Sequence, residues 1–260
     1  MLSPTEAVSK KLKNYIDLTD QELDTLARMP GRSLVISAGE DIVHEGQSGH
    51  RAFILQDGWV MSYKLLPEGA RQVIDFQVPG DFLGLRSLLL RTSDHSFEAV
   101  TDVRVAEVKA QDMLSTFSSS PRLAMAILWA VSCDEAMVVE HLVNIGRRSA
   151  IERTAHFLLE LGARLRLIGV GNAQGYPCPL SQYQLADTLG LSAIHINRVL
   201  RQLREQKLLT FQKGHVRFDD LEKLIELAEF EMGYLDQVGP ILVKCCLLYT
   251  SDAADDLLCV

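Results

Sequence analysis

Residues 179–209 read PLSQYQLADTLGLSAIHINRVLRQLREQKLL, and this stretch decides the fold of the C-terminal half. Ser181 is a predicted N-cap, and apolar residues then recur at helical spacing as far as Gly190, which tolerates the backbone that ends a helix. Ser192 is the predicted cap of a second helix, whose buried stripe begins at Ile196. Two short helices joined by a glycine turn are typical of a helix-turn-helix, whose second helix enters the DNA major groove.

The residues that follow favour nucleic-acid binding over the alternative, an ordinary helical hairpin within a core. A helix-turn-helix at 181–206 is followed at 208–218 by two short alternating segments around Lys213 and Gly214, which predict a β-hairpin. Together they form the pattern of a winged helix. The whole chain has a net charge of −8, but residues 147–218 hold 11 Lys and Arg against 4 Asp and Glu. Because phosphate binding depends on the local field, this region is predicted to bind double-stranded DNA.

The second helix of the motif presents a polar face. Positions 194, 197, 198 and 201 follow one another at i, i+3, i+4 and i+7, and so share that face. The alternative for most of these side chains is a solvated helix surface. The candidate DNA-binding residues are Gln182, Ser192, Ala193, Ile194, His195, Asn197, Arg198 and Arg201.

Composition indicates a soluble globular protein. The chain has 260 residues, of which 47% are hydrophobic and 23% charged, so it can bury the cores of two domains. No run of about 18 apolar residues predicts a membrane span, and the first residues lack the apolar centre of a signal peptide, so we expect a cytoplasmic protein. Residues 244–260 contain CLLYTSDAAD, which resembles translated adapter sequence. We therefore do not expect these residues to belong to the folded domains. Cys133 and Cys178 are then lone thiols, which indicates a reducing compartment.

The N-terminal half shows a different pattern. Short apolar segments separated by glycines from residue 32 to 108 predict a small β-sandwich or barrel, interrupted by PGDFLGL at 79–85. A long helix is predicted at 121–145, with Gly146 as a hinge after it. Its apolar positions step by three and four, which is typical of a coiled-coil seam with a second copy, the alternative being a helix packed on its own barrel. The seam residues are Leu128, Val131, Glu135, Val138, Leu142 and Ile145.

The order of these parts resembles the Crp/Fnr superfamily of bacterial transcription regulators. The most specific pieces are GRRSAIERTAHFLLEL at 146–161 and LADTLGLSAIHINRVLRQLREQKLL at 185–209. The resemblance implies an α+β chain: an N-terminal double-stranded β-helix, the jelly-roll-like β-roll of a sensor domain (15–112), a dimerisation helix (121–145) and a C-terminal winged helix-turn-helix (147–236). It also implies a homodimer on an inverted-repeat operator, with RNA polymerase as a candidate further partner. Arg198 matches the family's recognition-helix arginine, which reads guanine.

The same resemblance bears on the effector. Members that bind cAMP carry F-x-G-E-L, whose Glu holds the ribose, and an Arg-Ser or Arg-Thr pair that holds the phosphate. This chain matches at Phe82 and Gly84, but Leu85 replaces the Glu, and His95 and Ser96 stand at the pair. An apolar side chain and a neutral imidazole are poor substitutes, so cAMP binding is disfavoured. These five residues are the effector-pocket candidates.

No cofactor is identified from the sequence. Residues 1–132 contain no cysteine, which disfavours the iron–sulfur cluster of oxygen-sensing relatives. Haem ligation by one of the seven histidines is a minor alternative. A metal site at His44, Glu45 and His50 lacks the required spacing, so no metal is expected.

No catalytic constellation is present, so no enzyme activity is expected. The predicted function is a dimeric, sequence-specific transcription regulator, whose β-roll either senses an effector other than cAMP or has lost sensing. The alternative is a cyclic-nucleotide-type regulatory module that controls a protein partner without binding DNA.

Overall fold

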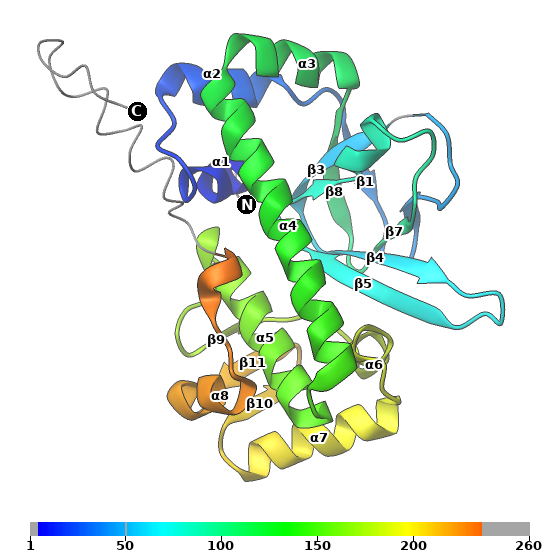
Figure 1. Ribbon diagram of the computed structural model, residues 1–260, viewed down its shortest axis with the longest axis vertical. Coiled ribbons are helices and arrows are strands. Elements are labelled where there is room, and N and C mark those ends of the chain that lie inside the picture. Colours follow the sequence, from blue (N-terminus) through cyan, green and yellow to red (C-terminus); the bar gives the residue numbers. More distant parts are fainter. Residues whose placement is uncertain (1–4, 50, 236–260) are drawn as a thin grey trace, which may run out of the picture.

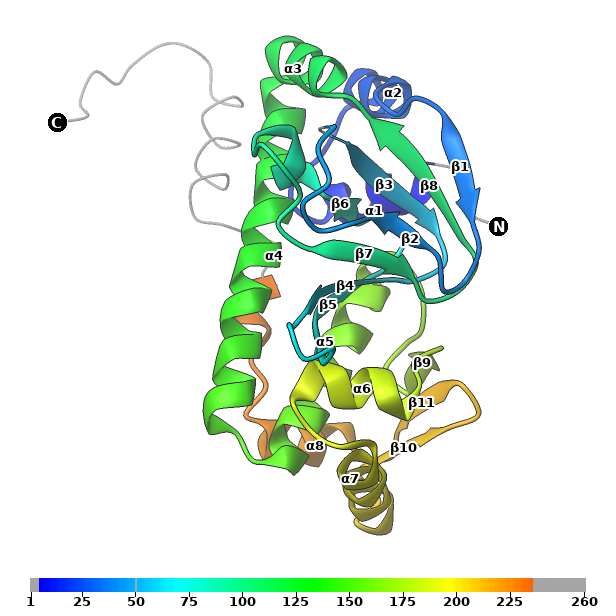
Figure 2. The ribbon, with the colours of Figure 1, turned by 90° about the vertical axis from the view of Figure 1, so that its right-hand side faces the viewer.

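The computed structural model describes residues 5–49 and 51–235 (Figure 1). The tail at 244–260, the predicted domain end at 236 and His50 lie outside the described residues. The long helix α4, Pro121–Arg147, runs the length of the molecule in both ribbon views, with the β-roll beside its first half and the helix-turn-helix beside its end (Figures 1 and 2). No described helix is both long and apolar enough to cross a bilayer.

The β-roll consists of two four-stranded antiparallel sheets that face each other. One has the order β1-β8-β3-β6 and the other β2-β7-β4-β5. Side chains from both sheets, among them Phe53, Val60 and Phe97, form the core between them. The strands are β1 Ser33–Ile36, β2 Asp41–Val43, β3 Ala52–Asp57, β4 Val60–Leu65, β5 Arg71–Gln77, β6 Phe82–Leu83, β7 Ser96–Ala99 and β8 Val103–Val108. The predicted glycine-separated strand pattern is therefore confirmed.

Helices cover the outer face of the β1-β8-β3-β6 sheet. They are α1 Glu6–Lys13, α2 Asp20–Arg28, α3 Ala110–Ser119 and the first half of α4. Thr19 begins α2 in a capping box with Glu22. The sequence reasoning predicted neither α1 nor α3. Phe82 leads into the short 3-10 helix η1, Leu85–Leu88, although the sequence predicts a helix as far as residue 90.

The break after the long helix is not at the glycine. Gly146 lies inside α4, so the prediction that the helix breaks at this residue is wrong, while its role as a hinge stays a prediction. Arg148 is extended instead, and Ser149 begins α5, Ala150–Leu167, in a capping box with Glu152. The box satisfies the first free N–H groups of the new helix, which makes this the favourable place for the chain to turn.

The C-terminal domain contains α5, α6 Gln182–Leu189, α7 Ala193–Glu205, the hairpin β10 Leu209–Gln212 and β11 His215–Phe218, and α8 Leu221–Ala228. A third strand, β9 Gly175–Pro177, pairs with β11, although the sequence at 169–179 predicts a loop. Gly175 permits this pairing, because a Cβ there would lie 2.0 Å from the Val216 carbonyl oxygen. The apolar spacing at 219–235 predicts one closing helix, but the structure has two pieces there, α8 and the 3-10 helix η2, Met232–Leu235.

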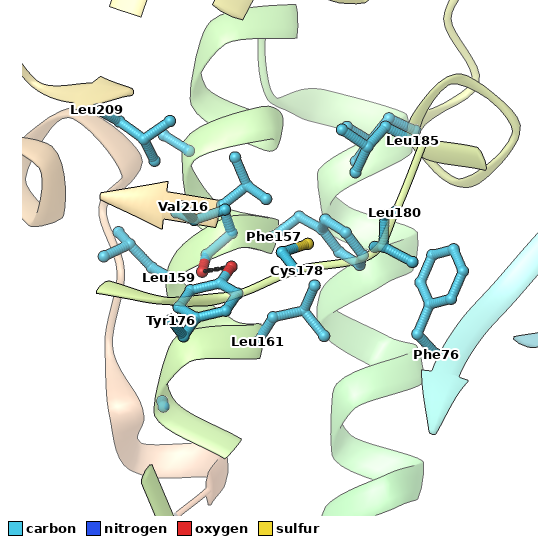
Figure 3. Packing of buried hydrophobic residues seen from close by; sticks show 14 of the residues in the cluster. Phe76, Phe157, Leu159, Leu161, Tyr176, Cys178, Leu180, Leu185, Leu209 and Val216 are labelled. Atoms are coloured by element: carbon cyan, nitrogen blue, oxygen red, sulfur yellow. Dashed lines mark hydrogen bonds between the residues drawn. The ribbon is translucent and has the colours of Figure 1, made fainter. Parts of the chain in front are cut away.

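The two domains share one hydrophobic core. Phe76 of β5 lies beside residues of the C-terminal domain in Figure 3, and its ring centroid is 6.0 Å from that of Phe157. Tyr176 is buried in the same cluster and donates a 2.6 Å hydrogen bond to the Leu158 carbonyl (Figure 3). The cluster therefore joins the sheet β2-β7-β4-β5 to α5 and β9–β11.

Candidate nucleic-acid interface and effector cavity

The helix-turn-helix is built as the sequence predicts. Ser181 and Gln184 form a capping box at the start of α6, and Gly190 ends the helix with a φ of 61°. The Ser192 Oγ accepts a hydrogen bond from the backbone N–H of His195 at the start of α7. These caps fix the angle between the two helices, and α7 lies at the end of the molecule away from the β-roll (Figures 1 and 2).

Helix α7 has one buried and one open face. Its buried side chains are Ile196, Val199, Leu200 and Leu203. The open face presents Ile194, which is 84% exposed, together with Asn197, Arg198 and Arg201. Ala193 and His195 are half-buried at its edge. The structure therefore brings the four residues predicted at i, i+3, i+4 and i+7 together on one accessible surface.

The other candidates serve partly as structural supports. Gln182 is exposed, and its side-chain oxygen accepts a 3.2 Å hydrogen bond from the Asn197 amide, which links α6 to α7. The Ser192 hydroxyl caps α7. Tyr183, which the sequence reasoning missed, is 74% exposed next to Gln182. The sequence signal for Tyr183 was an aromatic residue at the second position of the first helix, outside the apolar stripe that is predicted to be buried.

The hairpin β10–β11 extends the basic surface. Lys213 and Gly214 both have positive φ, of 52° and 71°, which is typical of a tight hairpin turn. His215 and Arg217 are exposed on β11, and Arg217 forms a 2.7 Å ion pair with Asp219. Lys213 therefore stands at the tip of a wing beside the helix-turn-helix.

A second site is a cavity of about 400 Å³ between the β-roll and the middle of α4. Four of the five effector-pocket candidates line it, namely Phe82, Gly84, Leu85 and His95. The fifth, Ser96, is not among the residues that line it. Ser96 lies in β7, and its hydroxyl accepts a hydrogen bond from the backbone N–H of Glu45 instead.

His95 lies in the wall of the cavity beside an acid. Its Nδ1 is 2.8 Å from Asp94 Oδ1, and its ring packs on Phe97. Burial lowers the pKa of His95, although Asp94 opposes that effect. The imidazole is therefore neutral near pH 7 and supplies no fixed positive charge to the cavity.

The predicted dimer seam lies on the open side of α4. Leu128, Glu135, Val138, Leu142 and Ile145 are exposed, and Leu142 is the most open of them at 72%. Val131 is half-buried. Val131, Glu135 and Val138 also line the cavity, so the seam and the cavity share one helix face. Val139, at 55% exposed, extends the same apolar surface. It was not predicted as a seam residue because the three-and-four spacing assigned the neighbouring Val138 to the seam.

A buried cluster of charged groups joins the domains beneath this cavity. Arg164 of α5 donates hydrogen bonds to Asp75, to Asp81 and to the Phe76 carbonyl, at 2.8 to 2.9 Å. Lys11 of α1 donates to the same Asp81 at 2.6 Å. We name these four side chains, Lys11, Asp75, Asp81 and Arg164, the junction cluster. Each buried carboxylate thus has a cationic partner from another element, which makes the cluster a connection between the sensor and the DNA-binding domain.

Next to the junction cluster, His141 of α4 lies between two acceptors. Nε2 is 2.8 Å from Glu160 Oε1, and Nδ1 is 3.1 Å from the Ile74 carbonyl. Burial alone would lower the pKa of His141, but the charge of Glu160 and the hydrogen bond to it raise the pKa to about 9. The ring is therefore an imidazolium that donates from both nitrogens.

Asp75, His141 and Glu160 bring one ligand atom each within 4.8 Å of one another, a spacing that a metal ion would accept. These groups are already engaged, however. Arg164 donates to Asp75, while His141 and Tyr234 donate to Glu160. A guanidinium next to the three ligands repels a metal cation, so their arrangement suits an ion-pair network better than a metal centre.

Comparison with known proteins agrees with both halves of this architecture. Residues 34–120 match the cyclic nucleotide-binding domain family, and residues 152–227 match the Crp-like helix-turn-helix domain family. The nitrogen fixation regulation protein FixK of Bradyrhizobium diazoefficiens is 31% identical over 199 residues, which are 76% of this chain and 82% of FixK. FixK of Rhizobium meliloti is 32% identical over 190 residues, 72% of this chain and 82% of that protein. The chain belongs to the Crp/Fnr family of transcription regulators.

Solved structures agree with this Crp/Fnr assignment. FixK2 from Bradyrhizobium japonicum superposes with a TM-score of 0.68 at 28% identity, covering 75% of this chain and 96% of FixK2. As a Crp/Fnr-type protein, the chain is a DNA-binding transcription regulator, and its relatives are regulators rather than enzymes. Family members are typically dimeric. The individual DNA contacts, the effector residues and the domain limits drawn from the sequence stay predictions.

Proposed function

We propose that this Crp/Fnr regulator acts as a homodimer that reads an inverted-repeat operator through α7, with half-sites about one helical turn apart. The observation that carries the proposal is the open basic face of α7 at the end of the molecule, where Arg198 has no hydrogen-bond or ion-pair partner within the described residues. A free guanidinium at this position suits bidentate recognition of guanine. Lys213 in the wing and Arg201 on α7 would contact phosphates.

Dimerisation is the second part of the proposal. The exposed apolar side chains of α4, above all Leu128, Val139 and Leu142, form a continuous surface along one helix. An isolated helix face of this kind gains stability when a second copy covers it. Two copies joined along α4 would hold two α7 helices at a fixed separation, as an inverted repeat requires. Contact with RNA polymerase stays a prediction.

Gating by an effector other than cAMP is the third part. Leu85 offers no hydrogen bond to a ribose, His95 is neutral, and the guanidinium groups of Arg86 and Arg164 are held by carboxylates, so the lining suits a cyclic nucleotide poorly. Arg164 lines the cavity and also belongs to α5 of the DNA-binding domain. An occupant would therefore touch both domains and favour one of their arrangements.

Selection of bound sequences from a random DNA library tests the first two parts together. We expect a two-fold symmetric motif, and a complex whose mass by light scattering corresponds to two chains per duplex. Counterion release predicts that affinity falls by about 10³ or more between 50 and 200 mM salt. A monomer that binds no duplex at low salt would support the alternative, a module acting on a protein partner.

Isothermal titration with cAMP tests the third part. We expect no saturable heat. A micromolar isotherm with one site per chain would contradict the proposal that the effector is not cAMP.

A further inference from the structure

The charges that line the cavity are unusual for a pocket that would hold an anion. Five carboxylates line it against two guanidinium groups, Arg86 and Arg164. The carboxylates belong to Asp75, Asp81, Asp94, Asp134 and Glu135. His95 adds no charge, since burial lowers its pKa. Lys11 beside Asp81 and Asp134, and the His141 imidazolium beside Asp75, balance part of this charge, so the lining keeps a small negative excess that favours cations over anions.

Most of these carboxylates already have partners. Asp75 and Asp81 belong to the junction cluster, and Asp94 lies 3.3 Å from Arg86. Among the described residues, Asp134 forms an ion pair only with Lys11, at 3.7 Å, and Lys11 also pairs with Asp81, at 2.6 Å. Glu135 forms no ion pair or hydrogen bond with any residue in the described part of the chain. The α4 wall of the cavity thus offers one free and one weakly paired carboxylate.

A buried acceptor in the opposite wall is also unused. Gln77 of β5 is 9% exposed, and its Oε1 is buried without a hydrogen-bond partner among the described residues. The orientation of this amide follows from its neighbours. Ser62 Oγ donates its single proton to the Asp75 carbonyl, so the Gln77 nitrogen must donate to Ser62 Oγ, and it also lies 3.4 Å from Asp75 Oδ2. The unused atom is therefore an acceptor.

An unpaired buried acceptor is costly, so it calls for a donor that arrives from outside the chain. Within the described chain, the cavity-lining acceptors that lack a full set of partners are Gln77 Oε1, the Glu135 carboxylate and the Asp134 carboxylate, whereas Arg86 is held by Asp94. Their natural complement is a positively charged group that carries several N–H donors. The volume of about 400 Å³ suits a small organic molecule better than a single metal ion.

We propose that the cavity binds a small organic cation with N–H donors, an alkylammonium or guanidinium compound, between Gln77 and Glu135. This inference rests on the proposed function, since it names the chemical class of the effector. A cation here lies beside the carboxylates that hold Arg164, so its binding alters the strength with which Arg164 holds the DNA-binding domain. An anion of the same size meets repulsion.

Isothermal titration of the purified full chain tests the ligand class with matched probes. The probes are 1,4-diaminobutane, (4-aminobutyl)guanidine, succinate as an anion of similar length, and a permethylated bis-quaternary diamine that keeps the charge but has no N–H. We expect one diamine or guanidine site per chain, at least about tenfold tighter than either control. Equal binding of succinate or of the quaternary diamine overturns the proposal, as does tighter binding of Mg²⁺.

Two variants locate the site. Glu135→Gln and Gln77→Leu should each weaken diamine binding about tenfold. Glu68→Gln, an exposed residue that does not line the cavity, should leave it unchanged. Glu135 is exposed, so its variant is expected to fold, and light scattering checks that its oligomeric state is retained. Unchanged binding in Glu135→Gln overturns the proposed site.

The same preparation is assayed for DNA by fluorescence anisotropy, with the selected duplex. DNA binding without diamine binding refutes the ligand class and leaves the proposed function standing. Loss of all duplex binding refutes the proposed function itself, whatever the titration shows.

Discussion

Arg164 and Arg198 show two opposite uses of one side chain. Arg164 is buried at the domain junction, and its guanidinium reaches two carboxylates and a backbone carbonyl within 2.9 Å. Arg198 is exposed on α7 and has no such partner within the described residues. A buried guanidinium is retained only when its donors are satisfied, whereas an exposed one is free to bind a ligand. The first region should therefore govern stability, and the second should govern DNA affinity.

The largest expected effect is that of Arg164→Met. The change leaves Asp75 without its cationic partner and weakens the pairing of Asp81, both in buried positions. Removing one member of a buried pair costs about 3–5 kcal/mol of unfolding free energy. Urea denaturation followed by circular dichroism measures it. Arg198→Met is the matched control and should change stability by less than about 0.5 kcal/mol; equal losses in the two variants would remove the contrast.

The next effect concerns pH and His141. Its pKa is about 9 in the folded chain, because Glu160 outweighs burial, against an ordinary value of 6.5. The protonated ring stabilises the fold fully below pH 6.5, and this stabilisation is lost as pH rises through 9. The shift corresponds to at most about 3 kcal/mol.

Urea denaturation of wild type and His141→Gln at pH 6.5 and pH 9 measures this dependence. We expect the wild type to lose more stability over that range than the variant. His44→Gln changes an exposed histidine and serves as the control. Parallel curves for wild type and His141→Gln would show that the imidazolium does not form.

Arg198→Ala should act on the other region. We expect it to cost about 1–3 kcal/mol of DNA binding and to relax specificity at one base pair of each half-site, with unchanged stability. Anisotropy titrations against the selected duplex and its single-base variants measure both quantities. Arg204→Ala, also exposed on α7 but further along the helix and not among the predicted DNA contacts, is the control. A uniform loss across all base variants would mean that Arg198 contacts phosphate only.

The smallest effect separates capping from DNA contact at Ser192. Ser192→Ala removes the cap of α7 and should lower stability by about 1 kcal/mol. Ser192→Asp keeps a capping oxygen. Because Asp and Ser are similarly good N-caps, the unfolding free energy should stay within about 0.3 kcal/mol of the wild type. The new negative charge should nevertheless weaken DNA binding. Equal DNA affinity for the Asp variant would place Ser192 away from the phosphates.

The C-terminal motif could be predicted in detail because its signals are local. Ser181, Gly190 and Ser192 mark helix ends through contacts within three or four residues. The error at Gly146 has the same origin, since the glycine was preferred over the capping box of Ser149 and Glu152, which was equally visible. Long-range features were not accessible in this way. The pairing of β9 with β11 depends on the backbone of Val216 approaching Gly175, 41 residues earlier.

The cavity was only partly predictable. Phe82, Gly84, Leu85 and His95 were found through the resemblance to nucleotide-binding relatives. Gln77, Asp134 and Glu135 were not assigned to it, because their meeting depends on how α4 packs across the sheet. Glu135 stood out in the sequence only as a polar interruption of an apolar seam. The junction cluster gave no signal at all, since its members are 64 or more residues apart except for Asp75 and Asp81.

The core shared by Phe76 and Phe157 has a consequence for how this regulator can be rebuilt. Cutting the chain ahead of α5 would expose apolar side chains of this shared core on both fragments. Neither fragment is therefore expected to fold on its own. A chimaera that joins a foreign sensor domain to this winged helix will need an aromatic ring in the place of Phe76 to fold stably.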